Sequence, residues 1–191
     1  TLLVTVAVIV GVGCTFYSTE MMSLLYGKEH LGSVTTVFPL LMNCFIAIST
    51  TYVFGSLLTA NGNLRELNIM AFCGMVINVT LNLLFIKIFR LDAIGTAISS
   101  LSTQALTALA QVLIVRRIFK FKVNYRLLTT LLVYSAGVIA LADVTHTYLL
   151  RPQTNHGWIP GFLVMAAAAL AWAFAIRLVS IKGMFRIMKY G

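Results

Sequence analysis

Six long runs of apolar residues follow one another along this chain, and polar residues gather in the gaps between them. Each run has about 20 residues or more, and a helix of that length, rising about 1.5 Å per residue, crosses about 30 Å of hydrocarbon. Because a backbone in lipid must satisfy its own hydrogen bonds, the pattern predicts helices. The predicted spans are Leu2–Leu25, Val34–Ala60, Leu67–Phe89, Ile94–Val115, Leu127–Leu150 and Ile159–Val179.

The composition agrees with a membrane protein. Hydrophobic residues make up 60% of the chain and charged residues only 10%, which is more apolar surface than a soluble core can use. The predicted fold class is an all-α polytopic transmembrane helix bundle with six spans. The chain begins at Thr1, inside an apolar run and without a charged segment before it, so we expect a piece of a longer protein rather than a signal peptide.

The basic residues predict an orientation. Three segments, 61–66, 116–126 and 177–191, hold ten of the 14 Lys and Arg residues. Because two predicted spans separate each of these segments from the next, all three should lie on the same side of the membrane. Short cytoplasmic loops collect Lys and Arg, so both ends of the chain are predicted to face the cytoplasm. The net charge of +9 is therefore attributed to topology, and no nucleic-acid partner is expected.

The last residues, 180–191, combine apolar and basic positions at helical spacing. The apolar positions are Ile181, Met184, Phe185 and Met188, and the basic ones are Lys182, Arg186 and Lys189. This pattern is typical of a basic amphipathic helix on an anionic membrane surface. A frayed, solvated terminus is the alternative.

The sequence lacks the common motifs of enzymes. It contains no GxSxG, no HExxH, no phosphate-binding loop and no Gly-rich dinucleotide motif. The three histidines, His30, His146 and His156, do not have metal-ligand spacing. We therefore expect no catalytic residue, no metal and no cofactor, and the absence of an active site favours transport over catalysis.

Polar residues inside the apolar runs are the candidate functional residues, because a polar group in lipid is costly. In the run Ile94–Val115 several of them recur at steps of about one helical turn. The candidates are Asn43, Asn78, Asn82, Thr96, Ser100, Thr103, Gln104, Thr107 and Gln111. They predict either the lining of a water-accessible cavity or helix packing through small residues and amide hydrogen bonds, and both interpretations stay open.

Asp143 and His146 form a second candidate site, three residues apart in the run Leu127–Leu150. Residues at this spacing lie on one face of a helix. A carboxylate inside a span is costly unless water or a partner relieves it. The pair is interpreted as an ion relay or, alternatively, as a local Asp–His contact near the outer surface.

Several segments resemble a known family. They are Leu24–Gly27, Gly55–Gly62, Ile77–Ile86 and Ile94–Gln104. Their order and spacing are similar to the C-terminal half of polysaccharide and O-antigen flippases, in the multidrug/oligosaccharidyl-lipid/polysaccharide exporter superfamily. The likeness covers residues 20–115, and the rest of the chain is similar only in hydropathy.

This resemblance implies two related helix bundles with an alternating-access cavity between them. It implies a bacterial inner membrane protein that flips a lipid-linked oligosaccharide, with membrane lipids and the remaining N-terminal helices of the same transporter as partners. Residues 1–115 would be four late helices of the second bundle, 116–126 a basic cytoplasmic loop, 127–179 the final helix pair and 180–191 the tail. The basic residues expected to bind a pyrophosphate are not evident in the spans.

Other functions remain as alternatives. A cation-coupled multidrug exporter of the same superfamily would keep the fold and change the substrate. A membrane-embedded glycan polymerase or acyltransferase would need a large outer loop with charged residues, whereas the longest outer gap here, 151–158, is short. A membrane scaffold without transport activity is the third alternative, and the polar positions inside the spans disfavour it.

Overall fold

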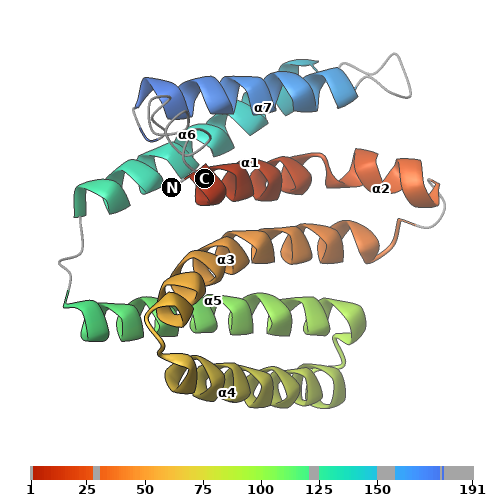
Figure 1. Cartoon of the computed structure of the whole chain (residues 1–191). Helices are drawn as coiled ribbons and strands as arrows, with labels where there is room; N and C mark the ends of the chain where they lie inside the picture. Colours follow the sequence, from red (N-terminus) through yellow and green to blue (C-terminus); the bar gives the residue numbers. More distant parts are fainter. Residues whose placement is uncertain (1, 28–30, 121–124, 150–157, 177, 179–191) are drawn as a thin grey trace. The chain divides into compact units, whose positions relative to one another are not determined.

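A computed structural model describes residues 2–27, 31–120, 125–149, 158–176 and 178 (Figure 1). Every regular element within these residues is helical, which confirms the predicted all-α class. The helices are α1 (Leu2–Phe16), α2 (Ser18–Tyr26), α3 (Val34–Ala60), α4 (Leu64–Leu83), η2 (Leu84–Ile88), α5 (Asp92–Phe119), α6 (Tyr125–Leu149) and α7 (Trp158–Ala175). The predicted amphipathic tail lies outside the described residues.

The helices are long and apolar enough for a multi-pass membrane protein. Within the described residues five of them meet this condition, and a sixth span is counted if α1 and α2 are taken as one interrupted helix. One of the five spans joins α4 directly to η2, a short π-helix, and so extends over Leu64–Ile88. The predicted polytopic helix bundle is thereby confirmed.

The first predicted span, Leu2–Leu25, differs from the expected continuous helix. It is interrupted at Tyr17, between α1 and α2. The Tyr17 side chain is fully buried, and its hydroxyl donates to Oγ1 of Thr145 in α6 at 3.1 Å. Contacts with residues far away in the sequence hold this position. The break falls at a tyrosine and not at a proline or glycine, so the local sequence does not mark it.

The connection from α4 to α5 is tight and places the two helices side by side. The backbone N–H of Leu91 donates to the carbonyl of Phe85 at 3.1 Å, and both Arg90 and Asp92 have positive φ angles. A Cβ at Gly95 would lie only 2.9 Å from Cβ of Phe85, so a glycine is required for this close approach. The turn therefore fixes the start of α5 against the end of α4.

The chain divides into two compact units, 18–123 and the combination of 1–17 with 124–191. In the first unit α5 packs against both α3 and α4, and in the second α6 packs against α7 and both contact α1. This grouping differs from the predicted division after residue 115, since α1 joins the last two helices. The helices also extend into the predicted loop 116–126, because α5 continues to Phe119 and α6 begins at Tyr125.

Candidate functional site

The polar positions of α5 face its neighbours in the unit 18–123. Among them Ser99, Thr103 and Gln111 are buried, with exposed fractions of 0%, 7% and 2%. Buried polar side chains on a membrane-spanning helix require partners or water. Of the predicted α5 candidates, Thr103 and Gln111 are therefore internal to this unit, where Thr103 contacts α4 and Gln111 lies against α3.

Asn78 of α4 is the centre of a small hydrogen-bond network with α5. Its Nδ2 donates to Oγ1 of Thr103 at 3.3 Å, and its Oδ1 accepts a bond from Nδ2 of Asn82 at 3.0 Å. The hydroxyl of Ser99 donates to the backbone carbonyl of Asn78 at 3.1 Å. Asn78 thus joins the two helices through both its side chain and its backbone.

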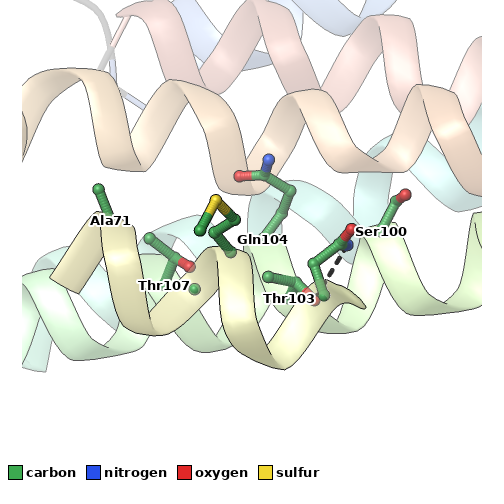
Figure 2. Close-up of a pocket in the computed structure, with 8 residues that line it drawn as sticks. Ala71, Ser100, Thr103, Gln104 and Thr107 are labelled. Atoms are coloured by element: carbon green, nitrogen blue, oxygen red, sulfur yellow. Dashed lines mark hydrogen bonds between the residues drawn. The ribbon is translucent and has the colours of Figure 1, made fainter. Parts of the chain in front are cut away.

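An open pocket of about 420 Å³ lies beside this network, between α4 and α5 (Figure 2). Its lining residues are Ala71, Gly74, Met75, Asn78, Ser100, Thr103, Gln104 and Thr107. Gly74 makes room for the polar side chains of α5, because a Cβ at this position would lie 3.1 Å from Oγ1 of Thr107. Five predicted candidates come together here, on two neighbouring helices.

The other four predicted candidates of this group lie outside the pocket lining. Asn43 donates to the carbonyl of Pro39 in its own helix at 2.8 Å, and Thr96 donates to the carbonyl of Ala93 at 2.8 Å. Asn82 supports Asn78 from one turn further along α4. Gln111 is buried against α3, where its Nε2 would lie 3.5 Å from a Cβ at Gly55.

Asp143 and His146 belong to the other unit and have different surroundings. Asp143 is exposed, while the ring of His146 packs edge-on against Tyr17, with ring centroids 5.4 Å apart, and against Phe16 at 6.3 Å. These contacts place the imidazole among aromatic rings at the end of α1. The ion relay stays a prediction, and the described residues contain no group of three or more potential metal ligands.

Two lining residues, Ala71 and Met75, were not among the predicted candidates. They lie on the same face of α4 as Gly74 and Asn78, at steps of three or four residues. They were not predicted because they are apolar, and alanine and methionine do not stand out from the other residues of a membrane helix. Helical spacing from Asn78 is the signal that could have found them.

Comparison of the chain with known protein families, curated proteins and solved structures gave no match.

Proposed function

We propose that this chain is part of a membrane transporter that flips a lipid-linked oligosaccharide, a polysaccharide precursor, across the bacterial inner membrane by alternating access. The observation that carries the proposal is the open, polar pocket between α4 and α5. Hydroxyl and amide groups at such a place are costly in lipid unless water or a ligand satisfies them. A transported polar group supplies such partners.

The depth of the pocket supports transport. Thr103 and Gln104 lie near the middle of α5, about 17 Å along the axis from its first residue. A helix of this length is long enough to span the hydrocarbon core, and in a bilayer these side chains are expected near its centre. Transporters commonly hold their substrates near the bilayer midplane, where either side of the membrane can reach them in turn.

The proposal includes an orientation with the basic segment 116–126 in the cytoplasm. Single cysteines replacing Lys120 and Gln153 in an otherwise Cys-free protein test it. An impermeant thiol reagent added outside intact cells should label only the second position. Labelling at position 120 would overturn the orientation.

Transport itself is tested with the variants Thr103→Leu and Gln104→Leu of the protein expressed in its natural host. Both variants should reduce export of the surface polysaccharide while the protein level in the membrane stays nearly unchanged. Thr80→Leu is the matched control, because Thr80 is exposed on α4 and, among the described residues, its hydroxyl bonds only to the carbonyl of Val76 in its own helix. This control should retain full export.

The competing explanation is helix packing, and it predicts loss of thermal stability together with loss of export. The melting temperature of each variant in detergent distinguishes the two explanations. Full export in both pocket variants would contradict the proposed function.

A further inference from the structure

The pocket between α4 and α5 is polar but uncharged. Each of its polar side chains is a hydroxyl or a carboxamide, and its remaining lining residues are Ala71, Gly74 and Met75. Along α5 the flanking charged residues, Asp92 and Arg116, are about 12 Å and 13 Å from the ends of the pocket lining. On α4 the charges of Arg65 and Glu66 are adjacent and opposite in sign. Because no charged side chain of the described residues lines the pocket, a ligand charge there would gain no adjacent counter-charge for the hydration that it gives up.

The loss of hydration decides which ligands the pocket favours. An ammonium or phosphate group that leaves water without an opposite charge carries a large desolvation penalty. A sugar hydroxyl carries a much smaller one, and hydroxyl and amide groups can replace its water as both donors and acceptors. The chemistry of the lining thus selects against ions of either sign.

Three polar side chains in the pocket are available to a ligand. Asn78 is occupied by Thr103 and Asn82, whereas Ser100, Gln104 and Thr107 make no side-chain hydrogen bond to any residue that the structure describes. Their spacing puts them on one face of α5, over a length of about 10 Å. Figure 2 shows the three in a row along this helix.

The exposed face of α4 next to the pocket residue Met75 is apolar. Met75 is 56% exposed, and its neighbours Phe72 and Val79 on α4 are 63% and 52% exposed. An alkyl chain attached to a ligand in the pocket could stay in contact with these residues or with lipid, since both are apolar. A polar pocket beside an apolar helix face fits an amphiphile, which has a polar head group and an alkyl chain.

We infer that this pocket binds the uncharged, hydroxyl-bearing part of an amphiphile and discriminates against cationic and phosphate head groups. The inference rests on the proposed transport function and narrows it, because a glycan satisfies this chemistry and a cationic drug does not. It also assigns any pyrophosphate of the substrate to a place outside the pocket.

The test compares three photoreactive amphiphiles with the same dodecyl chain: a maltoside, a trimethylammonium and a phosphate. The full chain is reconstituted in lipid nanodiscs, and crosslinked residues are mapped by mass spectrometry. The maltoside should label the pocket-lining segments of α4 and α5 with an affinity about tenfold or more above that of either charged probe, a difference of about 1.4 kcal/mol. Equal labelling, or preference for a charged probe, would overturn the inference.

Two variants sharpen the test. Gln104→Glu places a carboxylate in the pocket, so labelling by the maltoside should fall and labelling by the trimethylammonium probe should rise. Thr107→Val removes one hydroxyl at nearly constant volume, so it should weaken maltoside labelling about three- to tenfold without any gain for the cation. Ala93→Glu is the matched control, since it adds the same charge to the exposed first turn of α5, about 10 Å from the pocket lining, and should leave the preference unchanged.

The outcomes separate this inference from the proposed function. If the maltoside is preferred but Thr103→Leu and Gln104→Leu leave export intact, the pocket binds such head groups and the transport proposal is wrong. If those variants abolish export of the polysaccharide while the trimethylammonium probe is preferred, the transport proposal stands and the inference about an uncharged head group is wrong.

Discussion

Two helix pairs of this protein pack in different ways. In the unit 18–123, α4 and α5 are joined by side-chain hydrogen bonds around Asn78, and an open polar pocket lies beside their contact. In the other unit, α7 presents small or flexible residues every fourth position, and the buried ones are Gly161, Met165, Ala169 and Ala173. The buried residues of α6 are Tyr134, Val138, Ala142 and Thr145.

The contrast teaches how one apolar composition can support both a packed interface and a candidate binding site. Between α6 and α7, small side chains let the helices approach, and a Cβ at Gly137 would lie only 2.6 Å from Nε1 of Trp172. Between α4 and α5, polar side chains use some of their hydrogen-bonding capacity on each other and leave Ser100, Gln104 and Thr107 accessible. We expect the stability of the protein to depend mainly on the α6–α7 pair and ligand binding to depend on the α4–α5 pair.

The largest effect on stability is expected for Tyr17→Ala. Tyr17 is fully buried, bonds to Thr145 and packs edge-on against Phe162 with ring centroids 5.8 Å apart. Removing the ring leaves a cavity, and the free energy of unfolding should fall by about 3–5 kcal/mol. Unfolding by SDS in mixed micelles measures this change.

Tyr17→Phe is the control for the ring of Tyr17. It removes only the hydroxyl, and interhelical hydrogen bonds in membranes contribute about 0.6 kcal/mol on average. Its loss should therefore be about 1 kcal/mol or less. Equal losses for the Ala and Phe variants would mean that the hydroxyl, and not packing, fixes this position.

Gly137→Ala should follow, with a loss of about 1–3 kcal/mol, since the added methyl group overlaps the indole of Trp172. Gly55→Ala is the matched control in the other unit. A Cβ at Gly55 would meet Nε2 of Gln111 at 3.5 Å, an ordinary contact, so the higher helix propensity of alanine should leave stability unchanged or slightly raised. The same unfolding assay, applied to both variants, checks the contrast between the two helix pairs.

Asn78→Leu should lower stability by about 1–2 kcal/mol, because it removes the bond to Thr103 and leaves the amide of Asn82 without its acceptor. A double-mutant cycle with Thr103→Val isolates the direct contact, for which a coupling energy of about 0.6 kcal/mol is expected. Zero coupling would show that the 3.3 Å contact does not join the helices in the membrane.

The sequence predicted the helices well because apolar length is a local property. The predicted span Val34–Ala60 coincides with α3, and the other helix ends differ by a few residues. The break at Tyr17 was not predicted, because it coincides with the burial of one side chain among residues more than a hundred positions away. The grouping of α1 with α6 and α7 is likewise a long-range property.

Only part of the candidate site was predicted, because helical spacing is a local property and the packing of neighbouring helices is not. Helical spacing correctly brought Ser100, Thr103, Gln104 and Thr107 onto one face, and the pocket contains all four. Spacing alone could not distinguish Gln111, which lies on that face but is buried against α3, from the residues that line the pocket. That distinction depends on where the neighbouring helices approach.

Gln111→Met should have the smallest effect, and its sign tests the comparison most directly. Gln111 is 2% exposed, and within the described residues its Oε1 is buried without a hydrogen-bond partner. Such an acceptor destabilises the folded state, whereas methionine has a similar shape and no unsatisfied carbonyl. The free energy of unfolding should therefore stay constant or rise by about 0.5 kcal/mol, and maltoside labelling of the pocket should not change. A loss of about 2 kcal/mol or more would mean that this amide takes part in a polar network, and that the α3–α5 contact resembles the α4–α5 pair instead of the α6–α7 pair.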